Sequence, residues 1–307
     1  MNVPAPHLLD GGMGTFLLPL VENHTNTLQC TDTLNHSNPR AVIAAHSAFL
    51  AAGARFLTTN TFCCDALSLQ SSGLDPLALS QAGAALADQA KRQHHDAENI
   101  TIMGSLGPGW LSPEKKEITP QALTEEYARR ATGLLQGGVD AFVIETIRDL
   151  LQAEAALRGI EKALEQSLHT LQRKYPVFMM ASVSSTHPQA SAPTPKTDSP
   201  WVGQHPVAQA LQTLMQWQPS GLGFNCGEGP HHLSEPLSYL RSFEGAILLK
   251  PNAGRPGDYL SPQAFALAMK PYLTHQNVCI SHWGGCCGTS PEHLNALDLL
   301  SQQRLKV

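Results

Sequence analysis

Three cysteines in two glycine-rich segments carry the strongest chemical signal in this sequence. Cys286 and Cys287 are adjacent and flanked by glycines on both sides, and Cys226 lies between Asn225 and Gly227. A structural zinc site takes four protein ligands, whereas a catalytic zinc site takes three and keeps one coordination position open. Glycine permits turns that other residues avoid, so the flanking glycines would let two adjacent cysteines face one ion. We therefore expect these three thiols to meet in a catalytic zinc site.

The cysteines also allow simpler interpretations. A vicinal pair taken alone is often only a pair of small buried residues. A structural site with four thiolates usually draws on Cys-x-x-Cys pairs, a spacing that the remaining cysteines lack. We interpret the remaining four as packing residues: Cys30, Cys63, Cys64 and Cys279.

The overall composition excludes several classes of protein. The 307 residues carry a formal net charge of −5 and no basic run, so we expect no nucleic-acid partner. There is no uncharged apolar stretch of about 18 residues, and the first residues lack the pattern of a signal peptide, so we expect no membrane span. Seven cysteines are an odd number, and two close pairs are vicinal, which is poor geometry for a disulfide framework. This usage fits a reducing, cytoplasmic location best.

Short apolar runs alternate with longer amphipathic stretches along the chain. The runs predict eight strands, at residues 7–10, 55–61, 100–103, 141–144, 177–181, 221–224, 246–249 and 278–281. The stretches predict helices at residues 39–52, 75–93, 119–137, 149–173, 206–217, 232–242, 262–273 and 291–302. Alternation of this kind is typical of a parallel sheet. Eight repeats favour a closed (β/α)8 TIM barrel, an α/β fold that forms a single domain over residues 1–307.

Most of the polar or glycine-rich motifs follow a predicted strand, at the end where the active site of such a barrel lies. Cys226 follows the sixth strand and Cys286-Cys287 follows the eighth. Both strands end at the same mouth, so the three thiols can meet there. The other motifs at this mouth are Asp10-Gly11-Gly12-Met13-Gly14-Thr15, Thr59-Asn60-Thr61-Phe62, Gly104-Ser105-Leu106-Gly107-Pro108, Glu145-Thr146 and Lys250-Pro251-Asn252-Ala253-Gly254.

In sequence order these motifs resemble those of the homocysteine S-methyltransferase family over essentially the whole chain. The first two motifs, at residues 10–15 and 59–62, are closest to the homocysteine-binding module of cobalamin-dependent methionine synthase. The resemblance implies a (β/α)8 barrel in which the family's zinc cysteines match Cys226, Cys286 and Cys287. It also implies that Asn252 fills the fourth position of the Zn²⁺ ion in the empty enzyme.

The chain departs from the family after the fifth predicted strand. Residues 182–204 are rich in Ser, Pro and Thr and have no apolar period, which predicts a long loop. Methionine synthase modules usually carry a Thr-Leu-Ser-Gly-like stretch there, whereas this chain has Ser184-Ser185-Thr186. The difference concerns the shape of the amino-acid pocket or of a lid on the donor side.

The resemblance implies that zinc activates the thiol of homocysteine. A free thiol has a pKa of about 8.5 and is mostly protonated at neutral pH, whereas coordination deprotonates it. The sulfur then attacks a methyl carbon of the donor and gives methionine, without a covalent bond to the protein.

An amino-acid substrate needs partners for its ammonium and carboxylate groups. Asp10 and Glu145, at strand ends, are the candidates for the ammonium, and the resemblance favours Glu145. Backbone N–H groups near Gly11 or Ser105 are candidates for the carboxylate. Asn60 is a further candidate, although an asparagine in such a position more often anchors a loop.

The sequence leaves the methyl donor open. Four Trp and five Tyr supply few side chains for an aromatic cage around a quaternary ammonium. We prefer S-methylmethionine or a related small methyl donor. The alternative is the homocysteine-activating subunit of a split methionine synthase, which takes its methyl group from a corrinoid-carrying protein. An alternative of another class is a non-catalytic protein that binds zinc or thiols on the same barrel, although the acidic anchors Asp10 and Glu145 favour the enzyme.

Overall fold

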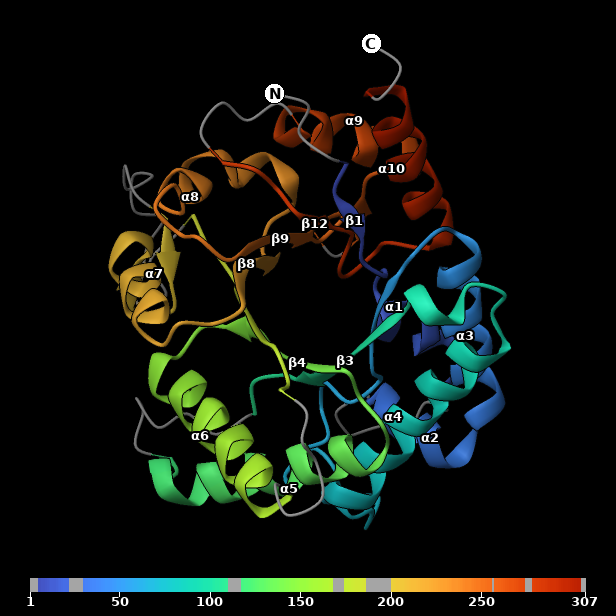
Figure 1. The fold of residues 1–307 in the computed structure, drawn as a ribbon, viewed down its shortest axis with the longest axis vertical. Helices are drawn as coiled ribbons and strands as arrows, with labels where there is room; N and C mark the ends of the chain where they lie inside the picture. Colours follow the sequence, from blue (N-terminus) through green and yellow to red (C-terminus); the bar gives the residue numbers. More distant parts are fainter. Residues whose placement is uncertain are drawn as a thin grey trace.

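Eight parallel strands form a nearly closed ring in this protein (Figure 1). The structure is a computed structural model that describes residues 5–21, 30–109, 117–167, 174–185, 200–255, 257–273 and 278–304. A parallel bridge between Leu9 and Phe56 joins the two ends of the strand order, which confirms the predicted (β/α)8 TIM barrel. Around the ring the strands are β1 (His7–Leu8), β12 (His282–Trp283), β9 (Ala246–Pro251), β8 (Gly221–Cys226), β5 (Val177–Ala181), β4 (Ala141–Ile147), β3 (Thr101–Leu106) and β2 (Phe56–Thr58).

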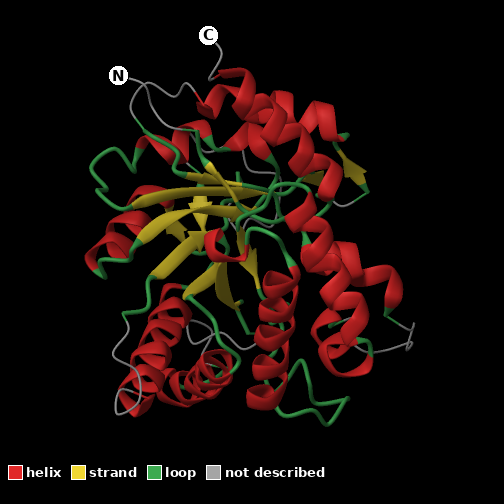
Figure 2. Cartoon of the chain, turned by 45° about the vertical axis from the view of Figure 1, so that its right-hand side comes forward, coloured by secondary structure: helices red, strands yellow, loops and turns green. Residues whose placement is uncertain are grey.

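Helices connect successive strands and cover the outside of the ring (Figure 2). The long helices are α3 (Pro39–Ala51), α4 (Pro76–Gln93), α5 (Pro120–Gln136), α6 (Leu150–Ser167), α7 (Val207–Gln216), α9 (Pro262–Leu273) and α10 (Pro291–Arg304). Shorter helical segments are α1 (Met13–Leu17), η1 (Leu18–Leu20), η2 (Thr31–Thr33), α2 (Leu34–Ser37), η3 (Ala97–Asn99), η4 (Pro230–His232) and α8 (Ser234–Ser238). Two small antiparallel pairs lie outside the ring: β6 (Trp201–Val202) with β7 (His205–Pro206), and β10 (Gly254–Arg255) with β11 (Asp258–Tyr259).

Three of the long helices begin as their sequences predict. The side chains of Asn38, Asp75 and Thr119 each accept a hydrogen bond from the backbone N–H three residues later. A proline follows each of them at the first helical position, where its missing N–H costs nothing. Local capping chemistry therefore fixes where α3, α4 and α5 begin.

Three predicted elements differ from the structure. The eighth strand lies at His282–Trp283 instead of 278–281, because these two residues pair with Leu248 and Leu249 of β9. The predicted helix 232–242 is reduced to η4 and α8, since the N–H groups of residues 239 and 240 bond three residues back instead of four. The predicted loop 182–204 contains the short strand β6, and its residues 186–199 lie outside the described part, as do residues 168–173 of the helix predicted at 149–173.

The interior of the ring is apolar at one level and polar at the next. Met103, Val143 and Leu248 are fully buried in one cluster inside the barrel. Side chains two residues apart on a strand point to the same face. The next inward positions on these strands are therefore Ser105, Glu145 and Lys250, which places three polar side chains at the carboxyl ends of β3, β4 and β9.

The described helices do not meet the requirements of a membrane span. None of them combines the length and the apolar character that crossing a bilayer requires.

Two buried histidines make the stability of this fold sensitive to acid. His46, on α3, is fully buried, and His282 packs against the rings of His7, Phe56 and Phe178 inside the barrel. Burial lowers the pKa of each histidine from 6.5 to about 4. Since the folded state favours the neutral form, each histidine contributes stability that is present above pH 6.5 and lost as the pH falls toward 4.

We expect the free energy of unfolding, measured by urea titration, to fall on acidification by roughly 1–3 kcal/mol for each of these histidines. The variants His46→Leu and His282→Phe should flatten this pH profile, whereas His95→Ala, which changes an exposed histidine, should leave its slope unchanged. An equally steep profile in the double variant would contradict the assignment.

Candidate metal and substrate site

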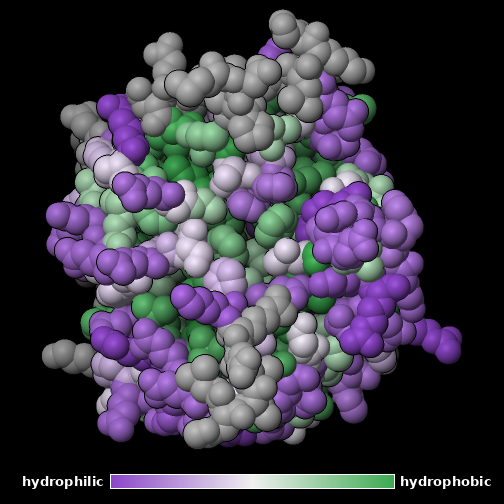
Figure 3. Space-filling view, in the orientation of Figure 1, coloured by the Kyte–Doolittle hydropathy of each residue, from purple (hydrophilic) through white to green (hydrophobic). Residues whose placement is uncertain are grey.

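A cavity of about 280 Å³ lies at the carboxyl ends of the barrel strands. Most of the residues predicted for the site line it, namely Gly11, Asn60, Ser105, Glu145, Cys226, Cys286 and Cys287. In the view of Figure 3, hydrophilic side chains cover the right-hand side of the molecule, whereas pale and green residues mix in the middle, over the ring of strands. The predicted residues therefore come together in one small cavity, although they lie far apart in the sequence.

The three predicted cysteines meet on the wall of this cavity. The Sγ atoms of Cys226, Cys286 and Cys287 lie within 4.8 Å of one another, and 3.1 Å separates those of Cys226 and Cys286. Hydrogen bonds to Cys286 and Cys287 raise the pKa of Cys226, whereas hydrogen bonds from Cys226 and Cys286 lower the pKa of Cys287 to about 3. The titration of each thiol thus depends on the other two, because the three share hydrogen bonds. Three sulfur donors at this spacing suit a thiophilic metal such as zinc.

Unusual backbone conformations position Cys226. Cys226 and Thr146 have φ values of 56° and 58°, in the left-handed region that residues with a side chain rarely adopt. Such a conformation costs on the order of 1–3 kcal/mol unless the surroundings impose it. Asn225 connects the two residues, because its Oδ1 accepts from the Thr146 N–H at 2.8 Å and its Nδ2 donates to Thr146 Oγ1 at 3.0 Å. The Thr146 hydroxyl then lies 3.3 Å from the Sγ of Cys226.

Asn252 links the two segments that carry the cysteines. Its Nδ2 donates to the carbonyl of Gly227 at 2.8 Å, and its Oδ1 accepts from the N–H of Cys287 at 3.0 Å. The side chain therefore holds the loop after β8 against the loop after β12. Its predicted place as the fourth zinc ligand stays a prediction.

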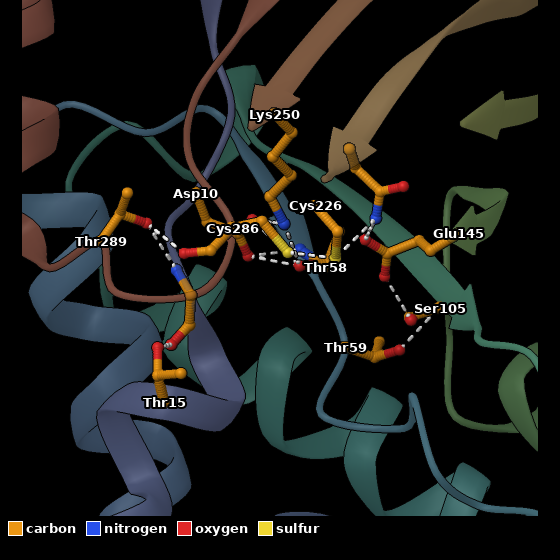
Figure 4. A network of polar contacts seen from close by, with 12 residues as sticks. Asp10, Thr15, Thr58, Thr59, Ser105, Glu145, Cys226, Lys250, Cys286 and Thr289 are labelled. Atoms are coloured by element: carbon orange, nitrogen blue, oxygen red, sulfur yellow. Dashed lines mark hydrogen bonds and ion pairs between the residues drawn. The ribbon is translucent and has the colours of Figure 1, made fainter. Parts of the chain in front are cut away.

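Asp10 is paired with Lys250, a residue for which no role was predicted. The Nζ of Lys250 lies 2.7 Å from Asp10 Oδ1, and the two side chains are 3% and 0% exposed (Figure 4). Asp10 also accepts hydrogen bonds from the N–H and the hydroxyl of Thr58, at 2.7 and 2.8 Å. Burial disfavours the charged form of Lys250, but Asp10, Glu145 and Cys286 raise its pKa above the ordinary value. The carboxylate of Asp10 is thus engaged within the protein, and its role as an ammonium ligand stays a prediction.

Glu145 points into the cavity from β4. Its Oε1 accepts from the hydroxyl of Ser105 at 2.5 Å, and its Oε2 lies 3.4 Å from Nδ2 of Asn225 (Figure 4). Burial raises the pKa of Glu145, and the positive charge of Lys250 opposes that rise. Glu145 is therefore a carboxylate on the cavity wall that a cationic ligand would stabilise.

Two of the other predicted substrate contacts, Asn60 and the N–H of Ser105, make hydrogen bonds within the protein. The Nδ2 of Asn60 donates to the carbonyl of Thr31 at 2.9 Å and to Oδ1 of Asn35 at 3.0 Å, as expected for a loop anchor. The N–H of Ser105 donates to Thr59 Oγ1 at 2.9 Å. A Cβ at Gly11 would lie 2.5 Å from a ring carbon of Phe49, so close packing requires glycine there. Substrate contacts by Gly11, Ser105 and Asn60 stay predictions.

Few aromatic side chains line the cavity among the described residues. Among the described residues, Phe62 is the aromatic residue that lines the cavity. Trp283 is fully buried, and Trp110 lies outside the described residues.

The interpretation of Cys279 as a packing residue is wrong, because its side chain is exposed. Lys250 and Thr146 belong to motifs that the sequence places at this mouth, but no role was predicted for either of them.

Comparisons with known proteins agree with this geometry. The sequence profile of the family described as homocysteine S-methyltransferase matches residues 7–299. The methionine synthases of Mycobacterium leprae and Mycobacterium tuberculosis are 30% and 29% identical over 299 residues, which cover 93% of this chain but only 23% and 24% of those proteins. The chain therefore spans about a quarter of the length of these curated relatives. The metallated form of the homocysteine methyltransferase MmuM from Escherichia coli shares the fold, with a TM-score of 0.71 and 21% identity over 96% of each chain.

The buried ion pair leads to a prediction about stability. Replacement of Lys250 by Met would leave the carboxylate of Asp10 buried without its cation, which we expect to lower the free energy of unfolding by roughly 3–5 kcal/mol. The double variant Asp10→Asn/Lys250→Met should recover part of this loss, because no isolated charge remains. Urea unfolding of the two single variants and the double variant measures the coupling. Strictly additive losses would show that the two side chains do not stabilise each other.

Proposed function

This chain belongs to the homocysteine S-methyltransferase family, and we propose that it transfers a methyl group to the thiol of homocysteine and gives methionine. Cys226, Cys286 and Cys287 would hold the zinc ion that this reaction requires. The observation that carries the proposal is the position of their three Sγ atoms, within 4.8 Å of one another, on the cavity wall that also contains Glu145. When bound there, zinc supplies an open coordination position that keeps a thiol in its nucleophilic thiolate form.

Glu145 supplies the charge that would bind the ammonium of the amino acid. The hydroxyl of Ser105 donates to its Oε1 at 2.5 Å and holds the carboxylate in place. Because burial disfavours the ionised form of Glu145, an ammonium that enters the cavity replaces the solvation that the carboxylate has lost. This contact would fix the backbone end of homocysteine and leave its sulfur free to reach the cysteine cluster.

Lys250 balances the negative charge that this arrangement concentrates. Its ammonium is buried beside Asp10, and Asp10, Glu145 and Cys286 stabilise the charged form. Lys250 is a positioning and charge-balancing residue in this proposal, since Asp10 and Thr58 already occupy its Nζ. It would oppose the repulsion between Glu145 and the thiolates.

A small methyl donor fits the cavity best. Its volume of about 280 Å³ is at the lower end of small-molecule sites. One aromatic side chain, Phe62, lines it among the described residues, which is too few for a cage around a quaternary ammonium. We therefore propose S-methylmethionine or a related small donor.

The methionine synthase relatives support a second candidate function. The chain aligns with 23% of the methionine synthase of Mycobacterium leprae, so the aligned part is a fraction of a longer protein. In this candidate function the chain activates homocysteine, and a corrinoid on another protein donates the methyl group at the mouth of the cavity.

The zinc site is tested by removing one ligand. We expect the Cys226→Ser protein to lose the zinc of this site and at least about 100-fold in methionine formation, because two thiolates and an alcohol bind zinc poorly. The Cys279→Ser protein, which changes an exposed thiol, should keep both. Full activity of the Cys226→Ser protein would exclude the proposed mechanism.

The donor is tested with a panel of S-methylmethionine, betaine, S-adenosylmethionine and methylcobalamin, each assayed with homocysteine. Methionine formed from S-methylmethionine supports the first candidate. Methionine formed only when a methylated corrinoid is supplied supports the second. Binding of zinc and homocysteine without turnover from any donor would favour a non-catalytic thiol-binding protein.

The role of Glu145 is tested by the isosteric variant Glu145→Gln. Loss of one charge-assisted contact of about 1.5–3 kcal/mol corresponds to a rise of roughly 10-fold to 100-fold in KM for homocysteine. The Ser105→Ala variant should raise KM less, because Ser105 acts through Glu145. A Glu145→Gln enzyme with unchanged KM would assign the ammonium to another group.

A further inference from the structure

A second cluster of metal-ligating side chains lies outside the proposed zinc site. The Sγ atoms of Cys30 and Cys63 and a carboxylate oxygen of Asp32 all lie within 4.8 Å of one another. Cys30 and Asp32 are buried and Cys63 is half-buried, while Asp32 and Cys63 line the same cavity as the first cluster. We propose that these three residues form a second metal site, which binds zinc or a similarly thiophilic divalent cation.

Hydrogen bonds hold the two segments of this site together. The Nδ2 of Asn60 donates to the carbonyl of Thr31 at 2.9 Å, and the Nδ2 of Asn35 donates to the carbonyl of Asn60 at 2.7 Å. These bonds fix the segment that starts at Cys30 against the segment that follows β2. The carboxylate of Asp32 in addition accepts a hydrogen bond from the N–H of Cys63. Hydrogen bonds within the protein thus hold the ligands in place, which reduces the cost of ordering them on binding.

The donor set has the chemistry of a zinc site. Zinc is borderline-soft and accepts both thiolate sulfur and carboxylate oxygen. Two thiolates and one carboxylate carry about three negative charges, which is one more than a divalent cation neutralises. The buried guanidinium of Arg130 provides a positive charge nearby, because it donates to the carbonyls of Thr61 and Phe62 at 3.2 Å and acts on Asp32. Arg130 therefore offsets part of the negative charge that three anionic ligands and the nearby carboxylate of Asp65 bring to a divalent cation.

The neighbouring Cys64 provides a matched control. Its side chain is fully buried against Leu69 and Leu79, and it is not part of the ligand cluster. A variant at Cys64 removes a thiol from the same segment without removing a ligand. The competing interpretation of Cys30 and Cys63 is a disulfide, which binds no metal.

The experiment measures zinc bound to the reduced protein after dialysis against zinc and then against buffer. We expect about two zinc ions per chain in the wild-type protein. Each of the variants Cys226→Ser, Cys30→Ser and Cys63→Ser should bind about one zinc ion per chain. The Cys64→Ala protein should keep both. The Asp32→Asn protein retains an acceptor for the N–H of Cys63 but should bind the second ion at least about tenfold more weakly.

A second readout is the thermal unfolding of the Cys226→Ser protein, which removes the first site. Zinc should raise its Tm, because a ligand that binds only the folded state stabilises it, and the added change Cys63→Ser should abolish the rise. These measurements need no methyltransferase activity, so the second site can be established even where the proposed function fails.

Three results would overturn the proposal. The first is a single zinc ion per chain in the reduced wild-type protein. The second is a zinc stoichiometry that is the same in Cys30→Ser and Cys63→Ser as in the wild-type protein. The third is a Cys30–Cys63 disulfide whose reduction brings no uptake of metal.

Discussion

Repulsion between like charges at the centre of the barrel is the constraint that the surrounding structure has to satisfy. Three Sγ atoms lie within 4.8 Å of one another, and Glu145 and Asp10 place two carboxylates at the same end of the ring. Lys250 is the cation that the fold brings into this group, and it is buried beside Asp10. A divalent metal held by the three sulfur atoms would add further positive charge to this group.

Geometry at the ends of β4 and β8 follows from this constraint. The left-handed conformation of Thr146 coincides with a shift of register between β4 and β5, and that of Cys226 lies at the last residue of β8. Asn225 holds Thr146 beside Cys226. Asn252 then joins the Cys226 segment to the Cys287 segment. Two asparagine side chains thereby determine the spacing of the thiols, and neither of them needs to contact the substrate to do so.

The sequence was sufficient to predict the barrel and the meeting of the three cysteines. Eight alternating repeats define a closed ring, and in such a ring the ends of the sixth and eighth strands share one mouth. The sequence was insufficient for Lys250 and Asp10, because their pairing depends on side chains that meet across the interior. It was equally insufficient for Thr146 and Cys226, since left-handed backbone is ordinarily signalled by glycine. Cys30 and Cys63 were interpreted as packing residues, and both pack in one apolar cluster with Cys64, Leu69 and Leu79. Their approach to Asp32 had no signal in the sequence, because it depends on Asn60 and Asn35 rather than on local spacing.

The seam between β1 and β2 has a consequence for the motions of the barrel. β1 and β12 contain two residues each, whereas six residue pairs join β8 to β9. The seam itself is formed by the Leu9–Phe56 bridge and by backbone hydrogen bonds from Arg55 to Leu8 and from Asp10 to Phe56. Segments with few ladder bonds open locally before the rest of a protein unfolds. The amide hydrogens of Arg55 and Asp10 should therefore exchange with solvent through local opening. The buried pair of Asp10 and Lys250, which joins β9 to the segment that follows β1, opposes that opening.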